Sequence, residues 1–416
     1  MTANQDIAVF PTPVALPLIR PPFNYEKLVD GKMTPQKNSY MMCIGLPGGK
    51  THEVQLDTGS TGIVLPTAML TDSDGKLPAD VICLGPAQIG YEPSGDVLSG
   101  CYYYVPSIQL GGVQTVVNGQ TETQYAAATG PVVVFGVEYA GTADNPKANN
   151  VDPGEGMMGI GFGRPTLGCL IGTTAYQIGN PLMSVVTPAG GHYYQSYMLT
   201  ASDADGSAFV TVGMMSTAFE AAYKGAALVK LTAGTPVEPT NAPKCCDCAV
   251  GPNPPAPPPA PPCWNSAPVS FSIKYGSGSD STFTAAGSML LDTGVDVMML
   301  STVTDPKATA TNNWAQNLGG ATITITAPSA ADAVVNYNFQ LASASIVVQS
   351  DTVWPVVAAA TGSAIAIEAP AVFQPVNLTA IPGSNFVNTG INVIQGYNYL
   401  YDGQAGYVGF APVTAS

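Results

Sequence analysis

Charged residues are scarce in this sequence, and basic residues are the scarcest. Only 10% of the 416 residues are charged, and 13 basic against 28 acidic residues give a formal net charge of −15. Nucleic acids and anionic membranes are bound through basic patches, so this composition argues against both partners. A surface that gains little positive charge in acid suits a protein that works at low pH. An acidic surface that only maintains solubility explains the composition equally well.

Histidine is rarer still, and His52 and His192 are its two copies. A Ser-His or Cys-His nucleophile would have to use one of them. The sequence has neither a Gly-x-Ser-x-Gly turn between a strand and a helix nor a His-Glu-x-x-His zinc motif. The glycines of residues 159–163 do not follow the spacing of a nucleotide-binding loop. We therefore expect no metal and no cofactor.

Long apolar runs are also missing. No run of 18 or more apolar residues occurs, so we expect no membrane span. Residues 1–6 have neither the basic start nor the long apolar stretch of a secretory signal. Either such a signal is absent from this chain or the protein is not exported by that route.

The eight cysteines form an even set, which favours disulfide bonds and an oxidising compartment. We therefore expect a secreted or periplasmic protein. Buried free thiols are an alternative, and zinc is another, although the paired Cys-x-x-Cys spacing of common structural sites is missing. The cysteines whose placement suggests bridges are Cys83 and Cys101, and a cluster of Cys245, Cys246, Cys248 and Cys263.

Strand and turn signals dominate the rest of the chain. Glycine (45) and proline (37) are abundant, and 46% of the residues are hydrophobic. From residue 38 onward, alternating segments of about four to eight residues are broken by Gly, Pro and Asn, which predicts an all-β protein. Short helices are expected at residues 217–223 and 305–318.

The sequence Asp-Thr-Gly occurs twice, beginning at Asp57 and at Asp292, and each copy lies between two apolar segments. Burying a lone carboxylate there is costly, so two copies suggest that the carboxylates face each other. Such a pair shares a proton, because like charges a few ångströms apart do not both ionise easily. One carboxylate can then activate a water while the other donates a proton to a carbonyl oxygen.

Four further segments follow in a recognisable order. Together with the two Asp loops they resemble the pepsin family of aspartic peptidases, from about Ser39 to the C-terminus. The resemblance implies an all-β, two-lobed pepsin-like fold with the active-site cleft between the lobes and one Asp loop from each lobe. The four segments are residues 154–161, 197–213, 387–390 (Val-Asn-Thr-Gly) and 399–412.

The resemblance assigns roles to the residues of the two loops. Asp57 and Asp292 would form the catalytic dyad, and the two Thr side chains would brace one loop against the other. The glycines allow the backbone to approach and donate to the carboxylates. The supporting residues are Thr58, Gly59, Ser60, Thr293 and Gly294.

The second loop departs from the family pattern at Val295, where Ser or Thr is usual. Ser60 is expected to donate to the outer oxygen of Asp57 and to favour its charged form, but Val295 has no such hydrogen bond to offer. This predicts a raised pKa for Asp292 and a pH optimum that is shifted upward. The family tolerates Ala at this position, so Val295 does not itself imply inactivity.

A hairpin flap should follow the first loop and carry a tyrosine over the substrate. Tyr91 is the candidate, followed by Ser94-Gly95 and Ser99-Gly100, and the run from Tyr102 to Tyr104 offers alternatives. The segment beginning at Tyr275 resembles a flap but precedes Asp292, so we interpret it as a decoy turn. The Trp that usually pairs with the flap Tyr is replaced by Val64.

The resemblance also sets the domain organisation. Residues 1–37 form a Pro-rich extension, which we expect to add an edge strand or to pack on the surface. Residues 38–195 form the N-terminal lobe, and residues 196–416 form the C-terminal lobe. A Cys/Pro-rich insertion near residues 235–265 interrupts the second lobe, and its Pro-rich part is expected to be an exposed spacer loop or, less simply, a docking segment.

The function predicted from these features is an acid-active aspartic endopeptidase that binds an extended polypeptide substrate, acts as a monomer and needs no cofactor. A non-catalytic binding or inhibitor protein on the same fold is the alternative, supported by Val295, the loose flap and the missing Trp. A third interpretation is a structural surface protein in which the Pro-rich insertion is a spacer.

Overall fold

The computed structural model describes most of the chain, and every structural statement below concerns these residues. They are 10–19, 26–29, 32–35, 40–91, 95–117, 120–150, 156–163, 167–171, 174–200, 208–235, 255–260, 262–275, 282–295, 297–302, 318, 320–341, 346–348, 351–357, 372–375 and 385–413.

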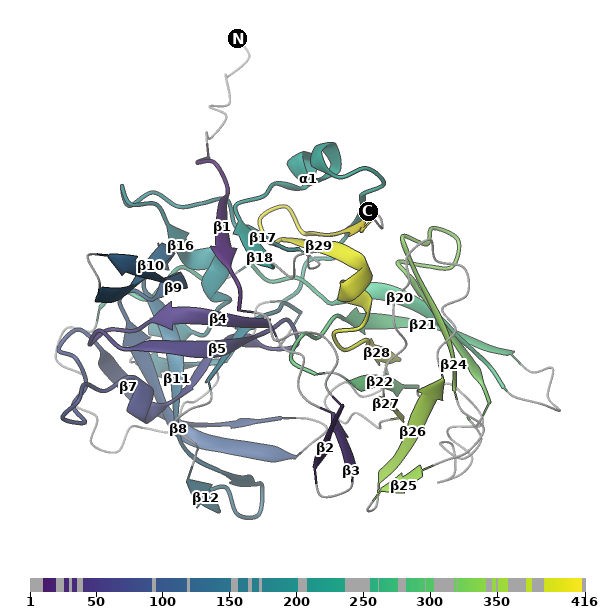
Figure 1. The fold of residues 1–416 in the computed structure, drawn as a ribbon, viewed down its shortest axis with the longest axis horizontal. Helices are drawn as coiled ribbons and strands as arrows, with labels where there is room; N and C mark the ends of the chain where they lie inside the picture. The colour runs from purple at the N-terminus through teal and green to yellow at the C-terminus, as the bar shows by residue number, and fades with distance from the viewer. Residues whose placement is uncertain are drawn as a thin grey trace, which may run out of the picture.

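The first large sheet has eleven strands and occupies one side of the molecule (Figure 1). Alternation puts Val54 and Leu56 of β5 and Ile63 and Leu65 of β6 into the core, at roughly 2 kcal/mol for each side chain. In sheet order the strands are β16 (Val185–Val186), β10 (Gln120–Thr129), β9 (Gln109–Val117), β4 (Tyr40–Gly45), β5 (Thr51–Asp57), β13 (Gly156–Ile160), β6 (Thr61–Pro66), β11 (Val132–Thr142), β8 (Asp96–Val105) and β7 (Ile82–Gly90), and β12 (Asn149–Asn150) pairs with β11.

The second large sheet has nine strands and lies on the opposite side (Figure 1). It is built from the same alternation of apolar and polar residues, as in β20, where Val269, Phe271 and Ile273 are buried. In order its strands are β24 (Val335–Leu341), β23 (Thr322–Ala327), β20 (Ala267–Lys274), β21 (Thr282–Leu290), β28 (Phe386–Asn388), β22 (Val297–Ser301), β27 (Val372–Pro375), β26 (Asp351–Val357) and β25 (Ile346–Val348).

A six-stranded sheet lies between the two large sheets (Figure 1) and combines strands from distant parts of the chain. One apolar cluster runs through all three sheets and includes Leu56, Tyr197 and Leu300. The three sheets make the all-β, two-lobed pepsin-like fold that the sequence predicts. The six strands are β1 (Val14–Pro17), β18 (Phe209–Val212), β17 (Ser196–Leu199), β29 (Tyr397–Asp402), β30 (Tyr407–Pro412) and β19 (Ala227–Lys230).

Small elements complete the fold. The two short hairpins are β2 (Glu26–Val29) with β3 (Lys32–Pro35), and β14 (Gly168–Ile171) with β15 (Thr174–Gln177). The helical elements are α1 (Ser216–Ala222) and the 3-10 turns η1 (Thr67–Met69), η2 (Pro181–Ser184) and η3 (Val393–Gly396). None of the helices in the described part of the chain is long and apolar enough to cross a membrane.

Several local expectations can be compared with this structure. The helix expected at residues 217–223 is confirmed as α1, and β1 adds an edge strand by pairing with β18, as expected for the extension. Residues 305–317 of the second expected helix lie outside the described residues. Cys83 and Cys101 lie on the adjacent strands β7 and β8. The structure forms no disulfide among the cysteines it describes, which do not include Cys245, Cys246 and Cys248.

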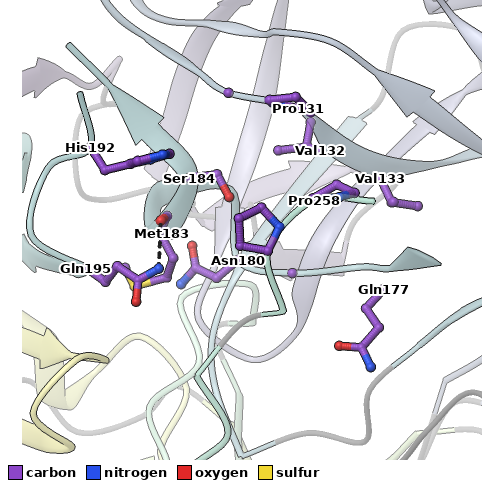
Figure 2. A pocket seen from close by; sticks show the side chains of 13 residues that line it. Pro131, Val132, Val133, Gln177, Asn180, Met183, Ser184, His192, Gln195 and Pro258 are labelled. Carbon is purple, nitrogen blue, oxygen red and sulfur yellow. Dashed lines mark hydrogen bonds between the residues drawn. The ribbon is translucent and has the colours of Figure 1, made fainter. Parts of the chain in front are cut away.

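The described part of the Pro-rich insertion packs on the first lobe and is not a free spacer. Tyr176 of β15 is fully buried, and its hydroxyl donates to the carbonyl oxygen of Pro255 at 2.5 Å. Pro258 and Pro259 line a small pocket together with residues that include Asn180 and His192 (Figure 2). Residues 256, 257, 259 and 260 are exposed, as expected for a surface loop, but the contact of Pro255 with Tyr176 attaches the segment to the first lobe. Since Tyr176 belongs to the other lobe and lies 79 positions away, sequence alone did not reveal this contact.

Candidate active site

Each Asp loop is held by the same arrangement of three strands. β13 lies between β5 and β6, parallel to the first and antiparallel to the second, and it supports the loop that joins them. In the other lobe β28 lies between β21 and β22 with the same directions. Because a loop between two strands is anchored by a third strand in both lobes, the two Asp loops are presented as rigid, related structures.

The two loops are joined by reciprocal hydrogen bonds between their threonines. The Thr58 N–H donates to the Thr293 hydroxyl at 3.0 Å, and the Thr293 N–H donates to the Thr58 hydroxyl at 2.9 Å. Each hydroxyl then donates across to the other lobe, Thr58 to the Leu291 carbonyl at 2.7 Å and Thr293 to the Leu56 carbonyl at 2.8 Å. The structure therefore places the predicted Thr pair as a cross-brace between the lobes.

This brace brings the carboxylates of Asp57 and Asp292 together. Both side chains are buried, with 6% and 8% of their surface exposed. A Cβ atom on Gly59 would lie 2.3 Å from Cγ of Asp292, and one on Gly294 would lie 2.6 Å from Oδ1 of Asp57. Each carboxylate thus lies against the glycine of the opposite loop, where only a residue without a side chain leaves room.

Backbone donors hold the inner oxygen of each carboxylate. The Gly59 N–H donates to Oδ1 of Asp57 at 2.6 Å, and the Gly294 N–H donates to Oδ1 of Asp292 at 2.9 Å. The pKa of Asp292 is raised well above its usual value, first by burial and then by the negative charge of Asp57 and a hydrogen bond shared with it. Asp292 therefore retains a proton at pH values where an ordinary carboxyl group has lost it.

The outer oxygens have donors from different sources. The Ser60 hydroxyl donates to Oδ2 of Asp57 at 2.5 Å, as expected. Val295 offers no donor, but the side-chain amide of Asn388 donates to Oδ2 of Asp292 at 2.7 Å. The expectation that Asp292 lacks this hydrogen bond is therefore wrong. Its pKa is raised all the same, because burial and Asp57 outweigh the lowering effect of Asn388 and Gly294.

Tyr91 lies at the turn of the hairpin formed by β7 and β8. Its N–H donates to the Asp96 carbonyl at 2.8 Å, and its own carbonyl accepts from the Gly95 N–H at 3.0 Å. Burial raises the pKa of Tyr91 to about 12, and the charge of Asp57 contributes. The tyrosine is therefore within electrostatic reach of the dyad, where a flap residue is expected. Val64 borders the same apolar cluster as Tyr91, in place of the Trp.

The other flap candidates lie elsewhere. Tyr102 and Tyr103 are buried within β8, with 3% and 4% of their surface exposed, and Tyr104 follows them in the same strand. Tyr275 comes directly after β20 in the second large sheet, and residues 276–281 lie outside the described residues. Among these candidate flap tyrosines, Tyr91 alone lies at a hairpin turn and has a pKa that is affected by Asp57.

A second tyrosine, which sequence reasoning missed, approaches the dyad from the six-stranded sheet. Tyr197 of β17 is fully buried, and its pKa is raised by burial, by Tyr399 and Tyr401, and by Asp57. Its hydroxyl has no hydrogen-bond partner among the described residues. The segment Ser-Tyr-Met-Leu at residues 196–199 does not indicate this, because the influence of Asp57 on Tyr197 depends on how distant parts of the chain pack.

Neither histidine belongs to this site. His52 is five residues before Asp57 on β5, which corresponds to about 16 Å along an extended strand. Burial lowers its pKa, and Lys50 contributes. His192 lines the pocket beside the Pro-rich insertion, which is lined by residues from β11, β15 and η2 but by neither Asp loop (Figure 2). That pocket is therefore separate from the paired carboxylates.

Comparison with known proteins adds one structural likeness. No protein-family model and no curated protein matches this sequence. Among solved structures, the chain is similar to the crystal structure of the aspartic proteinase from Irpex lacteus, at 15% sequence identity and a TM-score of 0.49. The match covers 97% of this chain and 98% of that chain.

Proposed function

We propose that this protein is an aspartic endopeptidase. The observation that supports the proposal most directly is the burial of Asp57 and Asp292 against each other's loops, with the threonines bracing them from both sides. A buried pair of like charges is costly unless it shares a proton. A protein that keeps such a pair aligned has the groups needed to move protons at a peptide bond.

The proposed reaction uses one proton of the pair and one water. Asp292 holds the shared proton at the start, because its pKa is raised. The charged Asp57 accepts a proton from the water as the water oxygen attacks the carbonyl carbon, and Asp292 donates its proton to the carbonyl oxygen. The resulting gem-diol collapses when the amide nitrogen takes a proton from Asp57, which breaks the C–N bond and returns a proton to Asp292.

The substrate proposed is an extended polypeptide held as a strand between the lobes. Tyr91 on the hairpin would cover it and exclude water, since it is buried at the turn and the charge of Asp57 affects its pKa. We further propose a monomer that is secreted or periplasmic, in which a bridge forms among Cys245, Cys246 and Cys248, the cysteines outside the described residues. Counting reactive thiols in the denatured protein, with and without a reducing agent, tests this bridge.

The decisive experiment measures cleavage of a denatured protein between about pH 2 and pH 7, with and without a statine-type inhibitor. Inhibitor-sensitive cleavage is expected in acid, and Asp292→Asn is expected to lower kcat by at least about 100-fold. Asp80→Asn, at an exposed aspartate of the same lobe as Asp57, is the matched control. A folded wild-type protein that cleaves at no pH would overturn the proposal and favour the non-catalytic binding protein.

A further inference from the structure

The supporting strands of the two loops can be aligned residue by residue. On β13 the residue opposite Gln55 is Met157, and on β28 the residue opposite Leu290 is Asn388. Gln55 and Leu290 each lie two residues before their catalytic aspartate, so Met157 and Asn388 occupy equivalent positions.

The loop residues beside these positions are equivalent too. Ser60 and Val295 each lie three residues after their aspartate. In the first lobe the loop supplies the polar side chain, and the Ser60 hydroxyl lies 3.9 Å from the sulfur of Met157 on the strand. In the second lobe the strand supplies the polar side chain, Asn388, and the loop has the apolar Val295. The donor and its apolar neighbour have exchanged places.

We propose that Asn388 is a positioning residue of the dyad, which does for Asp292 what Ser60 does for Asp57. The inference rests on the proposed function, because a positioning residue has meaning only if the pair is catalytic. Asn388 acts through Asp292 by holding the outer oxygen of that carboxylate in place and by favouring its charged form. The second loop therefore needs no Ser or Thr.

The amide of Asn388 is fixed so that its donor faces the carboxylate. Its Oδ1 accepts from the Gly390 N–H at 2.9 Å, which leaves the NH₂ group to donate to Asp292. The side chain is 5% exposed, and β28 is hydrogen-bonded to β21 on one side and β22 on the other. A donor that is already oriented in this way costs little reorganisation during the reaction.

Among the residues that the structure describes, few ionisable groups compete with this effect. Asp57 faces Asp292 across the loops and raises its pKa. The charge of Asp57 also affects Tyr91 on the hairpin and Tyr197 on β17, and the pKa of each is raised above its usual value, first by burial. Since these tyrosines stay neutral over the acid and neutral range, the pH dependence of Asp292 is governed by Asp57, burial and its hydrogen-bond donors.

Asn388→Met tests the proposal, because it copies the side chain that the first lobe has at this position. Losing the donor should raise the pKa of Asp292, so the alkaline limb of the kcat/KM profile should move upward by about one pH unit or more. The double variant V295S/N388M rebuilds the arrangement of the first loop and should return the limb to near the wild-type position. Val295→Ser alone, which keeps Asn388, should shift it by less than about half a pH unit.

A second readout separates this inference from the proposed function. Titration of the dyad carboxyl groups by infrared or carbon-13 spectroscopy needs no substrate, and it should show the same upward shift in Asn388→Met and the same return in the double variant. A wild type that cleaves nothing but shows these shifts would overturn the peptidase proposal and leave the carboxylate contact of Asn388 intact.

The proposal is overturned if folded Asn388→Met has the wild-type titration and the wild-type pH profile. It is also overturned if the double variant recovers stability but not the alkaline limb, because Asn388 would then be structural only. If Asn388→Met does not fold, Asn388→Ala removes the same donor without adding bulk. A wild-type titration and a wild-type pH profile in folded Asn388→Ala would then overturn the proposal.

Discussion

In the first Asp loop, the donor to the outer carboxylate oxygen is Ser60, which belongs to the loop itself. In the second loop it is Asn388, which lies 96 residues after Asp292 and belongs to the supporting strand. The remaining contacts match closely: both loops have a Thr cross-brace, a Gly N–H on the inner oxygen and a third strand beneath them. The loops thus make the same set of contacts and differ in the part of the chain that supplies the donor to the outer oxygen.

The electrostatic surroundings of Asp57 and Asp292 differ as well. The charge of Asp57 affects the pKa of two tyrosines, Tyr91 on the hairpin and the buried Tyr197, whereas the pKa of Asp292 is itself raised. If one carboxyl group is to act as an acid and its neighbour as a base, their pKa values must differ. The matching loops and supporting strands align the two carboxyl groups, but only differences between the surroundings of the two loops can give the groups different pKa values. Substitutions in each loop can distinguish the contacts that align the two carboxyl groups from those that give them different pKa values.

The largest effect is expected from the Thr cross-brace, and it should be equal in the two loops. Thr58→Val and Thr293→Val keep the shape but leave one carbonyl and one N–H of the opposite loop without a partner in a buried site. Each should therefore lower the free energy of unfolding by about 3 kcal/mol. Urea denaturation measures this, and Thr121→Val, at an exposed position of β10, should change it by less than about 0.5 kcal/mol.

A large difference between Thr58→Val and Thr293→Val in the free energy of unfolding would contradict the view that the two loops are equivalent. It would mean that one lobe depends on the brace more than the other, and that the match in hydrogen bonds does not reflect equal roles. A small effect of both variants would mean that the strands beneath, rather than the brace, hold the loops together.

The next effect is a pH dependence of stability that comes from Asp292. Its pKa is well above the usual value in the folded protein and is about 3.9 in the unfolded chain. The folded state therefore binds this proton more tightly. The resulting stability is complete below about pH 4 and is lost as the pH rises through the folded pKa. The loss amounts to about 1.4 kcal/mol for each pH unit that separates the folded pKa from the unfolded one.

Urea unfolding of wild type and Asp292→Asn between about pH 3 and pH 8 checks this expectation. The variant has no carboxyl group to titrate at this position, so its stability should decline less as the pH rises. Asp57→Asn removes the neighbouring charge but keeps the burial, and its decline should lie between the two. Identical declines in wild type and Asp292→Asn would show that Asp292 is not the group that holds the proton.

The parts of this site that sequence could predict are those carried by short segments. The two Asp-Thr-Gly loops each place a carboxylate, a brace and a backbone donor within three residues, so the motif and the contacts coincide. Tyr91 could be proposed because a hairpin was expected directly after the first loop. The same holds for α1 and for the edge strand β1, whose formation depends on local pattern and one neighbouring strand.

Contacts that depend on register between distant strands were beyond prediction. Residues 387–390 were correctly associated with the second loop, yet nothing in Val-Asn-Thr-Gly says which side chain faces Asp292. That is decided when β28 pairs with β21 at Leu290. Tyr176 and Tyr197 are further examples, because the first donates to the Pro255 carbonyl across the lobes and the pKa of the second is affected by the charge of Asp57. Apparent defects such as Val295 can therefore be compensated by residues that are remote in the chain.

The smallest effect is expected from making the first loop resemble the second. Ser60→Val removes the donor to Oδ2 of Asp57, and kcat/KM should fall by about ten-fold, which corresponds to one hydrogen bond of roughly 1.4 kcal/mol. Adding Met157→Asn places an amide where the second lobe has Asn388, so S60V/M157N should recover most of the loss, whereas M157N alone should have little effect. Recovery would show that the donor can come from either the loop or the strand. If the double variant is no better than Ser60→Val, the strand position serves as a donor only in the second lobe, and the two frames are less alike than their hydrogen bonds indicate.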